Sequence, residues 1–286
     1  MGVVATGFAV REPPLAAGVR RLRQMGFAVR LGEHVLARDG YLAGDDATRA
    51  GELIAMLEEP DVRAVWFARG GYGSARILER LPWSELARGD KLLVGYSDVT
   101  ALLSAAVERT RSRCLYGPVV AELGWSTAYD AASLRALLGG RGFERRVRAR
   151  DVVLPGRARG PIAGGNLTLL ASLCGTAFQP DLRGKVLLLE EVGEEAYRID
   201  RLLTQLHLAG CFAGIRAVLL GAMRAPRRRR FPPDRRLDEV LTERFAALGV
   251  PVVRGLPVGH VPGKWTLPIG GQAEIDCAAR RLRFAP

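Results

Sequence analysis

Two short apolar runs, each followed by a stretch with helical spacing, constrain the fold of this chain most strongly. Residues 62–67 and 92–96 are mostly apolar and are bounded by turn or charged residues, as strands buried on both faces are. After the second run, apolar residues recur at helical spacing, as at Val99, Leu102 and Leu103. Alternation of strand and helix predicts a parallel sheet covered by helices, so we expect an α/β fold in this part.

The pattern changes in the second half of the chain. Residues 141–160 are rich in glycine and arginine and lack a long apolar period, which predicts a linker. Beyond it, residues 186–189 and 217–220 are strand candidates, and residues 237–248 have helical spacing. We therefore expect a first domain at 1–140, a linker at 141–160 and a second domain at 161–286.

The formal charge of +12 raises the question of a polyanionic partner. The chain has 42 basic residues, and only Lys91, Lys185 and Lys264 are lysines. Residues 224–236 carry seven arginines and one aspartate, so half of the surplus lies in one segment that three prolines keep from regular structure. No aromatic platform, helix-turn-helix or zinc-finger spacing accompanies this segment, so nucleic acid is not expected as a partner.

Cysteines and apolar runs point to the same kind of environment. The four cysteines are widely separated and form no C-x-x-C pair, which favours buried thiols in a reducing compartment over a metal or redox site. No apolar run reaches the roughly 18 residues of a membrane span. The first residues lack the features of a secretory signal. We expect a cytoplasmic protein that needs no metal or other cofactor and has no membrane partner.

Ser97 is a candidate nucleophile, because it stands where a buried strand gives way to a helix. Gly95 precedes it by two positions, as in a nucleophile elbow, although Val99 replaces the usual second glycine. Taken alone, this segment favours a simpler interpretation, in which Ser97 or Asp98 caps the helix that follows. Residues 70–73 form a G-G-x-G turn after the previous strand, which suits either an oxyanion site or a tight turn.

An acid and an imidazole in the second half complete a possible catalytic set. Glu190 ends an apolar strand, where sites of this fold class are often built. Alternation along the strand sends the neighbouring Glu191 to the opposite face. His260 follows a turn rich in proline and glycine and is one of only three histidines. Ser97, Glu190 and His260 thus give the order Ser…Glu…His, in which the acid orients the imidazole that takes the serine proton.

Six segments, in this order along nearly the whole chain, carry a family resemblance. They are 41–45 (YLAGD), 69–73 (RGGYG), 95–98 (GYSD), 164–167 (GGNL), 189–191 (LEE) with 197–201 (YRIDR), and 259–260 (GH). Together they resemble the L,D-carboxypeptidase family of serine peptidases, which includes muramoyl-tetrapeptide carboxypeptidases and microcin-immunity proteins. One departure is the opening strand, which runs into VVATGF rather than into the Pro-Ser pair usual in the family.

The resemblance implies a fold and a site. The fold would be α/β, with a Rossmann-like parallel-sheet N-terminal domain and a smaller β-rich α+β C-terminal domain. Ser97 would be the nucleophile, Glu190 the orienting acid and His260 the general base, and the backbone N–H groups of Gly71 and Asp98 would form the oxyanion hole. The resemblance also implies a cytoplasmic homodimer that needs no metal.

The implied activity is the hydrolysis of an L,D peptide bond that releases terminal D-alanine from murein tetrapeptide during cell-wall recycling. Two alternatives remain at this point. One is an immunity-type amidase that cleaves a peptide–nucleotide toxin, for which Trp265 offers an aromatic ring. The other is a non-catalytic module that binds a ligand in the same cleft.

Overall fold

The computed structural model describes residues 1–87, 90–110, 112–226 and 235–286. Most of the arginine-rich segment predicted as a loop therefore lies outside the described residues. The chain divides into two units of similar length. The first comprises Met1–Leu134 and Pro262–Ile269, and the second Arg135–Val261 and Gly270–Pro286.

The first unit is built on a six-stranded sheet, of which all but one strand run parallel. Its strands, in spatial order, are β12 (Leu267–Ile269), β5 (Arg113–Tyr116), β4 (Leu92–Gly95), β3 (Ala64–Phe67), β1 (Gly2–Val4) and β2 (Arg30–Leu31). Only β12 pairs in the antiparallel direction, on the outer side of β5. The predicted parallel sheet is confirmed, because the apolar runs at 62–67 and 92–96 form its neighbouring strands β3 and β4.

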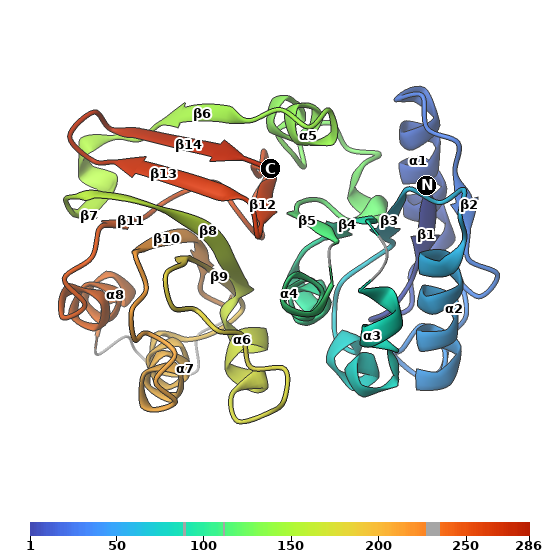
Figure 1. The fold of residues 1–286 in the computed structure, drawn as a ribbon, viewed down its shortest axis with the longest axis horizontal. Coiled ribbons are helices and arrows are strands. Elements are labelled where there is room, and N and C mark those ends of the chain that lie inside the picture. The colour runs from blue at the N-terminus through green and yellow to red at the C-terminus, as the bar shows by residue number, and fades with distance from the viewer. Residues whose placement is uncertain (88–89, 111, 227–234) are drawn as a thin grey trace. The chain divides into compact units, whose positions relative to one another are not determined.

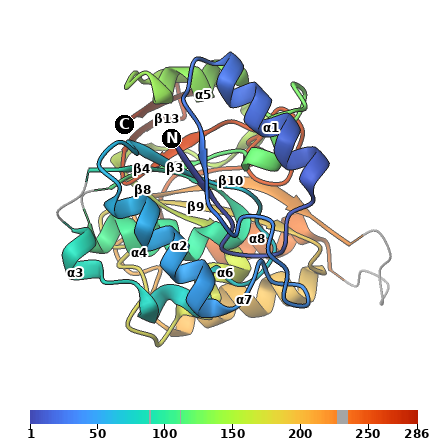
Figure 2. The ribbon, with the colours of Figure 1, turned by 90° about the vertical axis from the view of Figure 1, so that its right-hand side faces the viewer.

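Helices cover both faces of this sheet. They are α1 (Glu12–Gln24), α2 (Asp46–Glu58), α3 (Trp83–Leu86), α4 (Thr100–Arg109) and α5 (Ala131–Leu138), the last of which crosses the boundary between the units. Figures 1 and 2 show α1 and α2 on opposite sides of β1. Val65, Trp66 and Phe67 are consequently inaccessible to solvent, which explains why β3 has no polar face in the sequence.

The second unit has a mixed, eight-stranded sheet. Its strands, in spatial order, are β6 (Phe143–Arg146), β14 (Arg281–Ala285), β13 (Gln272–Asp276), β8 (Arg157–Asn166), β9 (Val186–Val192), β10 (Ala217–Arg224), β11 (Val252–Val253) and β7 (Val152–Leu154). Strands β8 to β11 pair in parallel, and the outer strands are antiparallel. This β-rich second half agrees with the expected fold class.

Residues 141–160, predicted as a linker, contain β6, β7 and the beginning of β8. Side chains of β6 and of the first residues of β8 alternate between partly buried and exposed positions, and the three residues of β7 are all partly buried, so no long apolar period marks these strands. The division into 1–140, 141–160 and 161–286 stays a prediction about domain boundaries.

The core of the second unit lies between its sheet and the helices α6 (Leu167–Leu173), α7 (Ala196–Leu208) and α8 (Leu237–Ala246). Helix α7 has an apolar stripe at helical spacing, in which Ile199, Leu203 and Leu206 are buried. Leu208, on the same helix, is 80% exposed. Burial of this stripe fixes α7 against β9, the strand that carries Glu190.

Within the described ranges, no helix is long and apolar enough to cross a membrane. The same residues hold no group of three or more His, Cys, Asp and Glu side chains placed to bind a metal. Cys114, Cys211 and Cys277 are buried free thiols, and Cys174 is partly exposed. Burial raises the pKa of the Cys114 thiol far above its ordinary value.

Leu203→Ala is expected to lower the free energy of unfolding by about 2–5 kcal/mol, because it empties a fully buried position. Leu208→Ala, on the solvent side of the same helix, should change it by no more than about 0.5 kcal/mol. Urea unfolding followed by circular dichroism measures both. Equal losses in the two variants would contradict the burial pattern of α7.

Candidate active site

Ser97 lies at a sharp turn between β4 and the helical residues that follow. Its backbone φ is +64°, a conformation that only one other non-glycine residue, Arg280, adopts in the described part of the chain. Such a φ is unfavourable for an L residue and persists only where the surroundings enforce it. The Ser97 N–H donates to the hydroxyl of Tyr116 over 3.2 Å. This turn has the strained geometry expected of a nucleophile elbow.

The glycine turn after β3 lies directly against Ser97. A Cβ atom at Gly70 would lie 3.2 Å from the Ser97 Cβ and 3.4 Å from its Oγ. Gly71 has a φ of +112°, and a side chain there would overlap the ring of Phe8. Within the described residues, the backbone N–H groups of Gly71 and Asp98 donate no hydrogen bond. The oxyanion hole formed by these two groups stays a prediction, and Asp98 itself is fully buried.

Asp98 does not cap the helix but joins the elbow to the glycine turn. Its buried carboxylate accepts hydrogen bonds from the N–H of Gly73 at 3.1 Å and of Ser74 at 3.0 Å. Burial raises the pKa of the Asp98 carboxyl, against the opposing effect of these hydrogen bonds and of the Arg49 charge. The capping alternative considered for Asp98 is therefore wrong, because its side chain bonds to a different loop.

Lys264 is a residue of this site that the sequence reasoning missed. Its ammonium is buried in the first unit, 2.7 Å from the Glu122 carboxylate and 3.2 Å from the Tyr96 hydroxyl. It also lies 4.4 Å from the centre of the Tyr96 ring, within cation–π range. Tyr96 immediately precedes Ser97, so this cluster packs against the strand that presents the serine. Only the scarcity of lysine in an arginine-rich chain could have drawn attention to it.

Glu190 and His260 form a hydrogen-bonded pair in the second unit. The His260 Nδ1 lies 2.7 Å from Oε2 of Glu190, and the His260 backbone N–H also donates to this oxygen, over 3.3 Å. The Glu190 side chain is inaccessible to solvent, whereas that of His260 is 21% exposed. Because a carboxylate accepts, Nδ1 carries the proton and Nε2 is the nitrogen able to take another. The geometry is that of an acid orienting a general base.

Glu191 has a different role from its neighbour. Its Oε2 accepts from the backbone N–H of Thr168 at 2.8 Å and from the Thr168 hydroxyl at 2.7 Å, at the beginning of α6. Its Oε1 accepts from Asn166 and from the backbone of Val192. Negative charge at a helix N-terminus is favourable, so Glu191 stabilises α6, while Glu190 holds the imidazole.

Glycines make room for the pair. Gly259 has a φ of +91°, and a methyl group there would overlap the Glu190 carboxylate. A Cβ at Gly221 on β10 would lie 3.1 Å from the Glu190 Cβ and 2.7 Å from the Val258 carbonyl. The tight packing of these glycines fixes the Glu190 carboxylate against the turn that carries His260.

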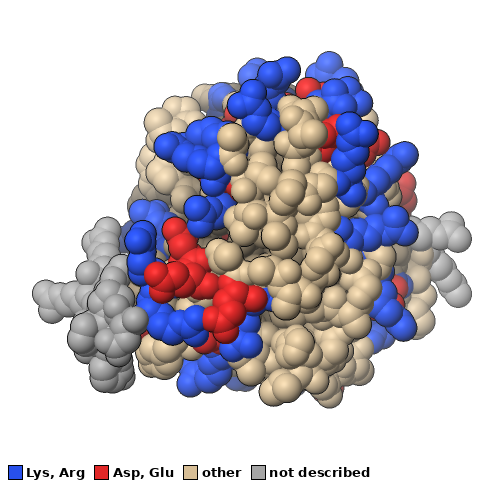
Figure 3. All heavy atoms as spheres, turned by 90° about the vertical axis from the view of Figure 1, so that its left-hand side faces the viewer, with Lys and Arg blue, Asp and Glu red and all other residues tan. Residues whose placement is uncertain are grey.

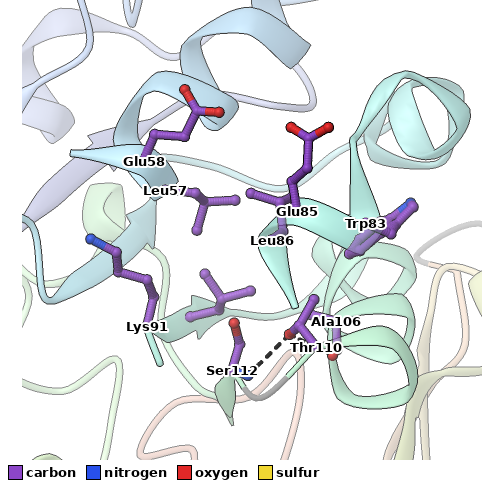
Figure 4. A pocket seen from close by; sticks show the side chains of 10 residues that line it. Leu57, Glu58, Trp83, Glu85, Leu86, Lys91, Ala106, Thr110 and Ser112 are labelled. Atoms are coloured by element: carbon purple, nitrogen blue, oxygen red, sulfur yellow. Dashed lines mark hydrogen bonds between the residues drawn. The ribbon is translucent and has the colours of Figure 1, made fainter. Parts of the chain in front are cut away.

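The predicted residues thus form two groups. Ser97, Asp98 and Gly71 come together in the first unit, and Glu190 and His260 pair in the second. A separate pocket of about 120 Å³ in the first unit lies where β4 and β5 begin (Figure 4). Trp83, Leu86 and Lys91 are among its lining residues, and none of the predicted site residues is.

Both halves of the chain match models of one protein family. Residues 1–117 match the LD-carboxypeptidase N-terminal domain, and residues 159–275 match the LD-carboxypeptidase C-terminal domain. The chain belongs to the LD-carboxypeptidase family. The resemblance carried by the six sequence segments is therefore confirmed, and with it a place among the S66 serine peptidases.

Relatives and solved structures cover nearly the whole chain. The murein tetrapeptide carboxypeptidase of Pseudomonas aeruginosa is 34% identical over 99% of this chain and 94% of its own length. A Streptomyces coelicolor protein whose carboxypeptidase assignment is provisional is 42% identical over 96% of this chain and 90% of its own.

Among solved structures, the muramoyltetrapeptide carboxypeptidase of Oxalobacter formigenes has a TM-score of 0.89 at 28% identity, covering 100% of this chain and 99% of its own. The microcin C7 self-immunity protein MccF has a TM-score of 0.87 at 23% identity, with 100% and 95% covered. At that identity MccF shows a common fold and nothing more.

Gly259→Ala is expected to break the Glu190–His260 hydrogen bond, since the added methyl group occupies the position of the carboxylate. The downfield Nδ1 proton of His260, observed by NMR, should disappear or move upfield. Gly249→Ala is the matched control, because Gly249 has a φ of +63° but open space at its Cβ position. Loss of the signal in both variants would show that backbone strain, and not the contact with Glu190, is responsible.

Proposed function

We propose that this protein is a serine-type L,D-carboxypeptidase that releases terminal D-alanine from murein tetrapeptide during cell-wall recycling. The observation that carries the proposal is the buried Glu190–His260 pair, in a chain that also presents Ser97 at a strained elbow. The names of the Pseudomonas and Oxalobacter relatives support murein tetrapeptide as the substrate.

In the proposed mechanism, the Ser97 Oγ attacks the carbonyl carbon of the L,D bond while His260 Nε2 takes the serine proton. Glu190 holds Nδ1–H and stabilises the imidazolium that forms. The N–H groups of Gly71 and Asp98 donate to the oxyanion of the tetrahedral intermediate. His260 then returns the proton to the leaving amine of D-alanine. Water, activated by the same imidazole, hydrolyses the acyl-enzyme and restores Ser97.

The proposal includes a homodimer acting in the cytoplasm, as the sequence resemblance implies. No metal or other cofactor takes part, because the triad supplies nucleophile, base and orienting acid. Figure 3 shows basic side chains scattered over one face of the molecule, with acidic residues between them. Scattered positive charge can attract an acidic murein peptide. Binding along a nucleic-acid backbone would instead need basic residues clustered in a patch or stripe.

An immunity-type amidase would use the same residues on a different leaving group. The two substrates are therefore compared directly, by offering a murein tetrapeptide and a peptide–nucleotide conjugate to the same preparation. Preferential cleavage of the conjugate would contradict murein tetrapeptide as the substrate and favour the amidase. If the protein binds one of the two compounds but cleaves neither, the result would support the non-catalytic binding module.

Ser97→Ala is expected to abolish release of D-alanine, with kcat reduced by about 10⁴-fold or more, because no other group can form the acyl-enzyme. Mass spectrometry of murein tetrapeptide after incubation detects the loss of one alanine. A serine-directed fluorophosphonate should label the wild-type protein at Ser97 and leave the variant unlabelled. Turnover of the tetrapeptide by Ser97→Ala at the wild-type rate would contradict the proposed mechanism.

Glu190→Gln should lower kcat by about 10⁴-fold, since an amide cannot hold the imidazole in the same tautomer and stabilise its charge. Glu191→Gln is the matched control on the adjacent position. It should retain kcat within about tenfold while lowering the free energy of unfolding by about 1–3 kcal/mol through weakened buried hydrogen bonds. Steady-state kinetics and urea unfolding separate the two effects, and the reverse pattern would exchange the roles of the two acids.

A further inference from the structure

The buried carboxylate of Asp98 connects the two segments that carry the proposed oxyanion donors. One donor is the Asp98 N–H itself, and the other is the N–H of Gly71 in the turn after β3. The Asp98 carboxylate reaches across to the N–H groups of Gly73 and Ser74, two and three residues beyond Gly71. A single side chain thus ties the elbow to the glycine turn.

Arg49 holds the same turn from the other side. Its guanidinium, on α2, is buried and donates from Nη1 to the Gly73 carbonyl over 2.9 Å and also to the Thr6 carbonyl. The N–H of Gly73 is therefore bound by a buried anion and its carbonyl by a buried cation. Arg49 also pairs with Asp46 on the same helix.

Close packing leaves the carboxylate little freedom. A Cβ at Gly7 would lie 2.5 Å from Oδ2 of Asp98, and a Cβ at Gly73 would lie 2.8 Å from Nη1 of Arg49. The hydroxyls of Thr6 and Ser74 are 2.9 Å apart and close the network. The glycine turn is thus held by hydrogen bonds and by steric contact together.

Burying charged groups is unfavourable unless their hydrogen bonds are complete, and a neutral side chain could hold an ordinary turn. Oxyanion stabilisation is different, because it depends on donors that are already in place when the charge develops. Fixing the separation of two N–H groups from different loops needs strong, directional hydrogen bonds between those loops.

We propose that Asp98 is a positioning residue whose side chain, assisted by Arg49, fixes the Gly71 N–H relative to the Asp98 N–H and so preorganises the oxyanion hole. The inference depends on the proposed function only for the serine chemistry of Ser97. It assigns Asp98 two separate roles, with the backbone as a donor and the carboxylate as the group that sets the distance to the second donor.

Asp98→Asn tests the inference, because it keeps the backbone donor and the shape of the side chain. Its NH₂ group would face one of the two N–H groups that the carboxylate now binds, so the turn should shift. We expect the second-order rate of fluorophosphonate labelling at Ser97 to fall about 10²–10³-fold, as for loss of one oxyanion donor. In a Ser97→Ala background, the same change should leave the Kd for intact tetrapeptide within threefold.

Asp276→Asn is the matched control. Its carboxylate also accepts a backbone N–H, from Ala279 at 2.9 Å, in the turn between β13 and β14. We expect wild-type labelling for this variant. Gly73→Ala supplies a second test if Asp98→Asn does not fold, because its methyl group would clash with Arg49 and so displace the same turn without altering the carboxylate. It too should slow labelling while sparing the Kd.

Wild-type labelling in a folded Asp98→Asn protein would overturn the inference. Equal losses of labelling and of tetrapeptide affinity would also overturn it, since they indicate a general structural role. The labelling assay does not depend on the murein substrate. A wild-type protein that is labelled at Ser97 but leaves tetrapeptide intact therefore refutes the proposed substrate and leaves the role of Asp98 to be decided separately.

Discussion

The parallel pairing of β3 with β4 is the constraint on which the first half of the site depends. Parallel neighbours end at the same edge of a sheet, so the glycine turn after β3 and Ser97 after β4 meet there without any further element between them. Tyr116, at the end of the next parallel strand, β5, supplies the hydroxyl that binds the Ser97 N–H. Three consecutive strand ends thus provide the serine, its support and the loop opposite it.

The second half of the site depends on an equivalent pairing, between β8 and β9. Their register places Asn166 opposite Glu190. The Asn166 amide donates to both acids of β9, at 3.3 Å to Glu190 and 3.1 Å to Glu191. One amide therefore donates to two buried carboxylates that have different partners. Glu191 binds the N-terminus of α6, and Glu190 binds the His260 imidazole. Buried charges of this kind are retained because their hydrogen bonds are nearly complete.

The sequence was sufficient to predict what depends on local pattern. The apolar runs at 62–67 and 92–96 are strands because parallel strands are buried on both faces, and the glycines flanking Ser97 and His260 mark turns that only small residues tolerate. It offered only helix capping for the Asp98 side chain, because a bond to a loop 24 or 25 positions away leaves no local pattern. It also missed the strands at 141–160, since half-exposed β structure rich in arginine has no strong period.

Lys264 illustrates contacts that no local pattern reveals, because it meets Tyr96 across 168 positions of sequence. Its surroundings explain why a lysine persists among so many arginines. A compact ammonium can lie over the Tyr96 ring and bond to both Glu122 and the Tyr96 hydroxyl in a space that is 3% exposed, whereas a planar guanidinium needs a wider slot. Lys264 follows His260 by four positions, yet it belongs to the first unit. The segment that bears the proposed base therefore continues directly into the residues packed against Tyr96, which precedes the proposed nucleophile.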